Sequence, residues 1–228
     1  VLAQRTNDVT LAAKAAPTSH FEIADVVAFA RRIASALGEL HRHGVVHRDV
    51  KPANLFLEDG DLRRAKLVDL GAAAVLEGPR KLTMTGGLVG TPAYMAPEQV
   101  RATEGVTPAA DVWALGCVLY ECLTGGPAFR AQHMVALLAK ILLDPPPSLD
   151  PRRGVPESLR AFVDRCLTKD PAERFADGDA MVAALRDVED VTGPSMASGS
   201  FTPSLGGTER RCRSEEHTSE LQSPCNIV

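Results

Sequence analysis

The sequence lacks an excess of basic residues and a long apolar run. Its 25 Lys and Arg are outnumbered by 29 Asp and Glu, which gives a formal net charge of −4. That balance provides no basic field for nucleic acid or for an anionic membrane surface, so we expect neither as a partner. No stretch of about 18 apolar residues is present, and no membrane-spanning helix is expected. No signal peptide is recognisable, so we predict a cytoplasmic location, although a parent protein could be anchored in a membrane through a missing C-terminal region.

Cysteine is scarce and does not occur in ligand-like pairs. The five cysteines include no Cys-x-x-Cys pair, and none has a His neighbour at metal-ligand spacing. We therefore expect neither a zinc site nor a disulfide framework. We expect most of the cysteines to be buried thiols in a reducing compartment: Cys117, Cys122, Cys166, Cys212 and Cys225.

Apolar periodicity is clear in the first half of the chain. With 45% hydrophobic residues in 228, the chain can bury the core of one domain and still leave a tail. Ser19 and Glu22 form a capping box that predicts the start of a helix ending near Gly44. Small strands around loops are predicted by three short apolar stretches, at 45–46, 55–57 and 66–68.

A second strong helical pattern follows Thr107, the predicted N-cap, and Pro108, the predicted first helical residue, and runs to Gly125. Its apolar residues lie nearly all round the helix, which is typical of a core helix. Further helices are predicted at 131–143, 156–168 and 178–190. The fold class is therefore α+β and predominantly α-helical.

The loop His47-Arg48-Asp49-Val50-Lys51-Pro52-Ala53-Asn54 gathers the groups that phosphoryl transfer needs. Such a reaction requires a carboxylate to orient the acceptor hydroxyl, a cation for the phosphate, and oxygen ligands for Mg²⁺. Asp49 could be the base or orienting group, Lys51 the phosphate contact and Asn54 a metal ligand. Asp69, in Asp69-Leu70-Gly71 after an apolar strand, offers a second metal ligand.

Together these motifs resemble the catalytic loop and the Asp-Phe-Gly element of bacterial Hanks-type serine/threonine protein kinases. Leu70 replaces the usual Phe, a mild departure that keeps an apolar plug. Lys51, two residues after Asp49, favours Ser and Thr acceptors over Tyr. The resemblance implies a kinase C-terminal lobe with short hairpins around the catalytic loop, the cofactors ATP and Mg²⁺, and protein substrates. Lys51, Asn54, Phe56 and Asp69 would contact the nucleotide and its metal, with Phe56 as the floor under the adenine.

Three further matches strengthen the resemblance. The stretch Gly90 to Glu98 is similar to the end of a kinase activation segment, in which Thr91 would contact Asp49 and Lys51. Asp111 occupies the place of a residue that bonds to the catalytic-loop backbone, and Arg174 that of the ion-pair partner of Glu98. We interpret these, and a buried His47, as structural. Three other histidines, His41, His43 and His133, are expected on the surface or in packing roles.

The resemblance also suggests regulation. Arg48 matches the arginine that pairs with a phosphorylated activation loop, and Thr83 and Thr85 precede Thr91 at the spacing of a threonine pair that such kinases autophosphorylate. A phosphate there would add charge and strong acceptors for Arg48, which could order the loop. Self-association for autophosphorylation is a further expectation.

No Gly-rich loop, strand Lys or paired helix Glu is recognisable before the catalytic loop, although a kinase N-terminal lobe supplies all three. We therefore expect residues 1–18 to be a poorly defined remnant near the hinge and 19–192 a truncated kinase C-lobe. Such a chain is expected to bind ATP weakly and to transfer phosphate poorly. A pseudokinase or a scaffold module remains the alternative.

The C-terminal part changes character. Residues 193–211 are rich in Gly, Ser, Thr and Pro and predict a flexible linker. Residues 213–223 read, codon for codon, as a translation of a common sequencing adapter. We therefore expect residues 212–228 to be an artefact and exclude them from fold reasoning.

Overall fold

The computed structural model divides into two units, residues 1–194 and 195–228. It describes residues 9–14, 21–69, 74–75, 92–103 and 105–192, all within the first unit. Ser19, Thr83, Thr85, Thr91 and the predicted C-terminal linker lie outside the described residues, as do Leu70 and Gly71.

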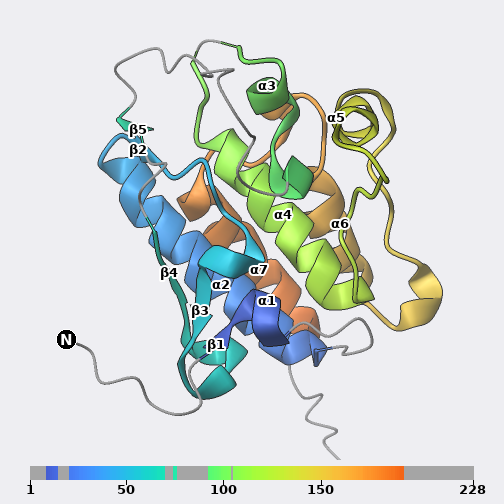
Figure 1. Cartoon of the computed structure of the whole chain (residues 1–228). Coiled ribbons are helices and arrows are strands. Elements are labelled where there is room, and N and C mark those ends of the chain that lie inside the picture. The colour runs from blue at the N-terminus through green and yellow to red at the C-terminus, as the bar shows by residue number, and fades with distance from the viewer. Residues whose placement is uncertain (1–8, 15–20, 70–73, 76–91, 104, 193–228) are drawn as a thin grey trace, which may run out of the picture. The chain divides into compact units, whose positions relative to one another are not determined.

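Helices dominate the described part (Figure 1). They are α1 (Leu11–Lys14), α2 (Ile23–Arg42), α3 (Pro97–Val100), α4 (Ala109–Thr124), α5 (Met134–Leu143), α6 (Glu157–Cys166) and α7 (Gly178–Thr192). The strands are β1 (Val9–Thr10), β2 (Val45–Val46), β3 (Leu55–Leu57), β4 (Ala65–Leu67) and β5 (Ala74–Val75). Single 3₁₀ turns are described at Pro52–Asn54, Glu58–Gly60, Leu62–Arg64, Pro92–Tyr94, Pro151–Arg153 and Pro171–Glu173.

Helix α4 forms the centre of the core, as its all-round apolar pattern predicted. It packs against both α2 and α6. Trp113 is fully buried and stacks on Phe129, with ring centroids 5.6 Å apart. The helix ends where Gly125 takes a left-handed conformation (φ 76°), which glycine adopts without a Cβ penalty. The predicted end at this residue is confirmed.

Helices α2 and α7 pack closely because each contributes a glycine. A Cβ on Gly178 would lie 2.3 Å from the carbonyl oxygen of Ala34, and one on Gly38 would lie 2.4 Å from a carboxylate oxygen of Asp179. Real Cβ atoms do not approach other atoms so closely, so the absence of side chains at both positions sets the distance between the helices. This contact fixes the start of α7 beside the last turns of α2.

Two small antiparallel sheets flank the loop of residues 47–54. The first has the order β1-β3-β4, with Leu55 opposite Leu67 and Val9 opposite Leu57. The second pairs β2 with β5. Residues 9–14, which the sequence placed in a poorly defined segment, thus add an edge strand and a short helix, and Leu11 is buried in the core. Their weak local pattern gave no sign of a partner strand more than forty residues later.

Some predicted boundaries are wrong. The first long helix begins at Ile23 with Glu22 as its N-cap, so Ser19 does not cap it. The Glu22 carbonyl accepts the first helical hydrogen bonds, and Asp25 in the first turn complements the positive end of the helix dipole. Pro108 is the N-cap of α4, one residue after the predicted Thr107, and it already has helical angles. The helix expected at 131–143 begins at Met134 instead, after an extended His133.

The described cysteines are three free, buried thiols, as predicted: Cys117, Cys122 and Cys166. Burial raises the pKa of each thiol, and that of Cys122 reaches about 12. Within the described residues, no helix is both long enough and apolar enough to cross a membrane.

Candidate active site

Asp49 lies at the centre of a hydrogen-bonded loop between β2 and β3. Lys51 Nζ donates to both of its carboxylate oxygens, at 2.9 Å to Oδ1 and 2.7 Å to Oδ2. Asn54 Nδ2 donates to the Asp49 carbonyl oxygen at 2.8 Å and to Oδ2 at 2.9 Å. The Asp49 side chain is nevertheless 35% exposed. The carboxylate is therefore fixed in direction and still open to an incoming group.

The backbone before Asp49 is anchored by Asp111, in the first turn of α4. This fully buried carboxylate accepts the backbone N–H of His47 at Oδ2 and that of Arg48 at Oδ1, both at 2.8 Å. Arg48 is held in a left-handed conformation (φ 65°), which strains a residue other than glycine. The two charge-assisted hydrogen bonds offset that strain, so the buried helix determines the shape of the loop.

His41 also belongs to this anchor, a role that local sequence pattern did not predict. Its side chain is 3% exposed, with Nε2 2.9 Å from Asp111 Oδ2 and Nδ1 3.1 Å from the backbone nitrogen of Gly178. Because Nδ1 accepts from an N–H, the proton of the neutral ring is on Nε2, which donates to Asp111. His41 thereby joins α2, α4 and the start of α7. No local signal could have found it, because Gly178 lies 137 residues away.

His43 and His133 are exposed, as expected. His47 is fully buried, with Nδ1 3.3 Å from the backbone nitrogen of Asp49. Its ring thus lies directly under the loop that presents the Asp49 carboxylate.

Asn54 and Asp69 are brought together by the β3–β4 hairpin. The backbone N–H of Val68 donates to the carbonyl of Asn54 at 3.0 Å, which places the next residue, Asp69, beside the catalytic loop. Asp69 is exposed and has φ 66°, a left-handed conformation that aspartate tolerates better than most residues. The amide nitrogen of Asn54 donates to Asp49, so its side-chain oxygen takes no part in that contact.

This donor set fits a magnesium ion. Mg²⁺ prefers hard oxygen ligands, and proteins commonly hold it with one or two side-chain oxygens while phosphate and water complete the shell. The Asn54 amide oxygen and the Asp69 carboxylate are oxygen donors of this kind. No larger cluster of His, Cys, Asp and Glu that could hold a metal occurs among the described residues.

A small pocket of about 40 Å³ lies beside Asp49 and Lys51, with Tyr94 on its other side. The Tyr94 hydroxyl donates to Glu121 Oε2 at 2.6 Å. Burial, and then the hydrogen bond to this carboxylate, raise the pKa of the Tyr94 phenol well above its usual value. Tyr94 therefore stays a neutral donor and ties the wall of the pocket to the end of α4.

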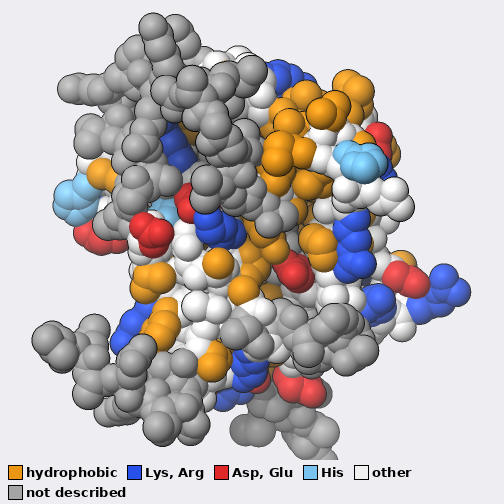
Figure 2. All heavy atoms as spheres, viewed as in Figure 1, with side chains coloured by type: hydrophobic (Ala, Val, Ile, Leu, Met, Phe, Trp, Pro, Cys, Tyr) orange, Lys and Arg blue, Asp and Glu red, His pale blue; other side chains and the backbone are white. Residues whose placement is uncertain are grey.

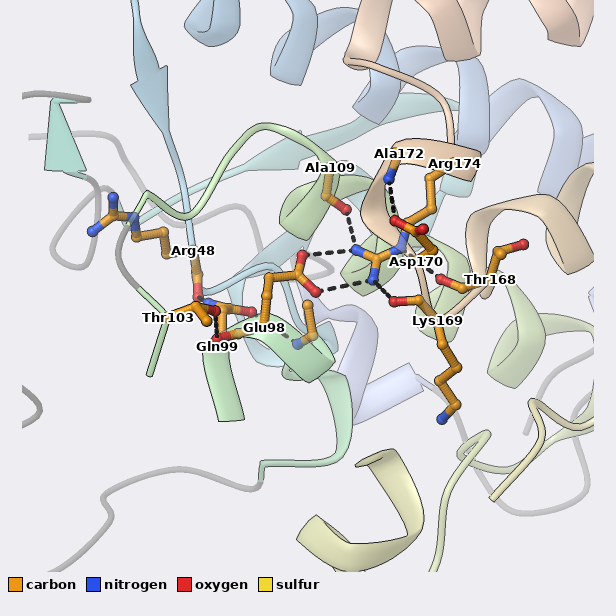
Figure 3. Close-up of polar contacts among 11 residues, drawn as sticks. Arg48, Glu98, Gln99, Thr103, Ala109, Thr168, Lys169, Asp170, Ala172 and Arg174 are labelled. Atoms are coloured by element: carbon orange, nitrogen blue, oxygen red, sulfur yellow. Dashed lines mark hydrogen bonds and ion pairs between the residues drawn. The ribbon is translucent and has the colours of Figure 1, made fainter. Parts of the chain in front are cut away.

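Glu98 and Arg174 form the ion pair that the sequence predicted (Figure 3). Two parallel hydrogen bonds join the guanidinium to the carboxylate, at 2.8 Å and 2.9 Å. The other donated bonds go to the backbone carbonyls of Ala109, Thr168 and Lys169, at 2.8, 2.7 and 3.0 Å. All five N–H donors of the buried guanidinium are thus used, which is the condition under which a buried charge is tolerated.

The other predicted residues are placed as follows. Arg48 points away from the Glu98–Arg174 pair in Figure 3, and its carbonyl accepts from Gln99 Nε2 at 3.0 Å. Its Nε is buried and makes no hydrogen bond within the described part of the chain. Phe56 is the half-buried middle residue of β3, opposite Thr10 and Lys66. Thr83, Thr85 and Thr91 lie outside the described residues.

Comparison with known proteins agrees with this geometry. Residues 3–185 match the family described as the protein kinase domain. The chain is 47% identical over 165 residues to serine/threonine-protein kinase PknD of Mycobacterium tuberculosis, which covers 71% of this chain and 24% of that protein. It is 44% identical over 166 residues to PknH of Mycobacterium bovis (72% and 27%) and 41% identical over 159 residues to PknE of M. tuberculosis (69% and 27%).

The chain thus spans about a quarter of the length of the curated relatives that it matches. The match covers most of this chain, from before β1 into α7. It includes the loop around Asp49, the anchor at Asp111 and the ion pair of Glu98 with Arg174, which are contacts between segments far apart in the sequence. This chain belongs to the protein kinase family, as a relative of bacterial serine/threonine kinases.

Proposed function

We propose that the parent protein of this chain transfers the γ-phosphoryl group of ATP to Ser and Thr hydroxyls of proteins. The observation that carries the proposal is the Asp49 carboxylate, held by Lys51 and Asn54 and still exposed beside a small pocket. The kinase relatives named above support the reaction class.

Asp49 acts in this proposal as the group that orients the acceptor. The carboxylate accepts a hydrogen bond from the substrate hydroxyl, whose oxygen attacks the γ-phosphorus as the bond to the ADP oxygen breaks. The hydroxyl proton passes to Asp49, and ADP leaves with the bonding electron pair. Lys51, now 2.7 Å from Asp49, can shift to the transferred phosphate and neutralise part of its charge.

Asn54 and Asp69 are the residues that would hold Mg²⁺ on the phosphates, and a bound Mg²⁺ would neutralise charge that develops during transfer. Phe56 lies on the same hairpin and can form the floor of the adenine site. Thr91 would help to seat the acceptor hydroxyl. The phosphate lid, the strand Lys and its Glu partner would come from a region upstream of this sequence.

Regulation by phosphorylation of Thr83 or Thr85 forms part of the proposal. Supporting it is the buried Nε of Arg48, which makes no hydrogen bond among the described residues and can donate to an added phosphate. Since Arg48 directly precedes Asp49, such a contact would couple the phosphate to the catalytic loop. Autophosphorylation through self-association is a route by which these threonines would be modified.

The test begins with the contiguous upstream reading frame. A protein extended to include a Gly-rich loop and a strand Lys is expected to phosphorylate itself and protein substrates with ATP and Mg²⁺. Asp49→Asn should abolish this activity and leave the circular dichroism spectrum unchanged. Retained activity would reject the role of Asp49, and an upstream frame without those two elements would favour a scaffold over an active kinase.

A further inference from the structure

Two open pockets in the described part are lined by basic residues. The two pockets differ in how many of these residues are paired with carboxylates. The larger, of about 830 Å³, lies between α2 and β4. Of the four basic residues that line it, Arg63 pairs with Asp25 at 2.6 Å and Lys66 with Glu58 at 3.2 Å, and Arg32 donates to the carbonyl of Ala65. The carboxylate of Glu39 also lines this pocket. An anion entering it would have to displace existing partners.

The second pocket, of about 420 Å³, lies where α4 ends and faces α5. Three cations line it, Arg130, Lys140 and Arg153, and no carboxylate belongs to the described lining. None of the three forms an ion pair within the part of the chain that the structure describes. The Asp150 carboxylate offsets part of the charge of Arg153. The cations around the cavity otherwise repel one another, and an anion bound among them would relieve that repulsion.

Among the described residues, groups of the protein itself contact only one of these three cations by a hydrogen bond. Arg153 Nη1 donates to the carbonyl of Thr124 at 3.3 Å, which places one cation at the negative end of the α4 dipole. The Arg130 guanidinium lies over Gly126, where a Cβ would come within 1.4 Å of its Nη2. The side chains of Arg130 and Lys140 donate no hydrogen bond to any described residue. Their donors are available to a ligand.

Helix α4 connects this pocket with the proposed phosphotransfer site. Tyr94 borders the small pocket at Asp49 and donates to Glu121. Tyr120, the preceding residue of α4, lines the basic pocket. Figure 2 shows Lys and Arg side chains, with acidic side chains beside them, near the carboxyl end of α4 and below the hydrophobic patch over α5. Asp111, which anchors the loop before Asp49, and Thr124, which lines the basic pocket, are at opposite ends of α4, about 20 Å apart at 1.5 Å per residue. An extended peptide with its hydroxyl at Asp49 would need about six residues to reach the pocket.

We propose that this pocket is a specificity subsite for the protein substrate, at which Arg130, Lys140 and Arg153 bind an acidic side chain several residues from the acceptor. The inference rests on the proposed kinase function and names its substrate class, a Ser/Thr segment with nearby carboxylates. Arginine and lysine donate charge-assisted hydrogen bonds to carboxylates, which select an acidic residue over a neutral one.

Binding can be measured without ATP. Fluorescence anisotropy would follow two labelled peptides, each with one Thr and a run of three Glu, placed before the Thr in one peptide and after it in the other. Matched peptides carry Gln in place of Glu. One Glu peptide is expected to bind the chain more tightly than its Gln partner, and Arg130→Ala with Lys140→Ala should weaken it about tenfold. Equal binding of the Glu and Gln peptides, or an unchanged affinity of the double variant, would overturn the proposal.

A matched control separates the pocket from general charge. Arg63→Ala with Lys66→Ala removes the same two charges from the α2–β4 pocket and should leave the affinity within about twofold, because those cations are already paired. An equal loss in both double variants would mean that net charge alone drives binding, and the subsite would be rejected. All four residues are at the surface, and unfolding curves would verify that each variant is folded.

The kinase proposal and the subsite fail in different experiments. If the protein extended upstream phosphorylates Glu and Gln peptides equally well, the kinase function stands and the subsite is wrong. If the extended protein shows no phosphorylation but the Glu peptide still binds through Arg130 and Lys140, the subsite survives as a docking site and the kinase proposal falls.

Discussion

Two charged groups of the described part, Arg174 and Asp49, are held in contrasting ways. Arg174 is buried and uses every N–H it has, on Glu98 and on three carbonyls. Asp49 is about a third exposed, and one of its two partners is a flexible lysine. The first arrangement leaves nothing for a ligand, whereas the second leaves room for one. Polar groups that are completely satisfied support the fold, and those left accessible can carry chemistry.

Breaking the buried pair should have the largest effect on stability. Arg174→Met would leave the Glu98 carboxylate and several carbonyls without partners, and it should lower the free energy of unfolding by about 3–5 kcal/mol. Urea denaturation of the chain would measure this loss. The double variant Glu98→Gln, Arg174→Met should recover part of it, because no buried charge remains. A loss below about 1 kcal/mol in the single variant would contradict the structural role.

Asp111→Asn is expected to have the next largest effect. The carboxylate accepts from two backbone N–H groups and from His41, and an amide cannot accept from all three. The expected loss is about 2–3 kcal/mol in the free energy of unfolding. Glu121→Gln, on the same helix, provides the control, since its oxygen can still accept from Tyr94 and should cost less. Equal losses in the two variants would show that Asp111 is not a special anchor.

The buried thiols should make stability fall at high pH. Burial raises the pKa of Cys122 from 9.0 to about 12, so the unfolded chain loses this proton first. The stability that the protonated Cys122 thiol contributes is fully present below the pKa of the unfolded chain and is lost as pH rises toward the pKa in the folded state. From about pH 8 to about pH 10 the free energy of unfolding should fall by about 1 kcal/mol. Urea midpoints across this range would measure it, and Cys122→Ala should show a shallower decline. An identical decline in the variant would exclude Cys122 as a contributor.

The smallest effect on stability is expected at Asp49 itself. Asp49→Asn keeps the size of the side chain and leaves the carbonyl contact with Asn54 in place, so the free energy of unfolding should change by no more than about 0.5 kcal/mol. Denaturation of this variant beside Arg174→Met gives the direct comparison. A loss of several kcal/mol would mean that the Asp49 loop is as much a part of the framework as Arg174, and the contrast between the two regions would disappear.

Much of the fold was visible in local sequence pattern. The core helix was predicted by apolar residues all round it and by Pro108 and Gly125 at its ends, and the catalytic loop by its dense polar residues. The predicted capping box at Ser19 is wrong, because residues with capping side chains can occur without a helix starting at them. The helix begins at Ile23, with Glu22 as its N-cap. Residues 9–14 were missed because an edge strand of two residues has almost no pattern of its own.

The sequence by itself determined the chemistry: a carboxylate, a lysine, an amide and a second carboxylate in the order typical of phosphoryl transfer. Tertiary structure alone decided how they are held and what surrounds them. His41 reaches Gly178 across 137 residues and Arg174 reaches Glu98 across 76. The cations of the two basic pockets also differ in the partners that folding gives them. Side-chain type is local information, whereas burial and pairing depend on contacts between segments distant in the chain.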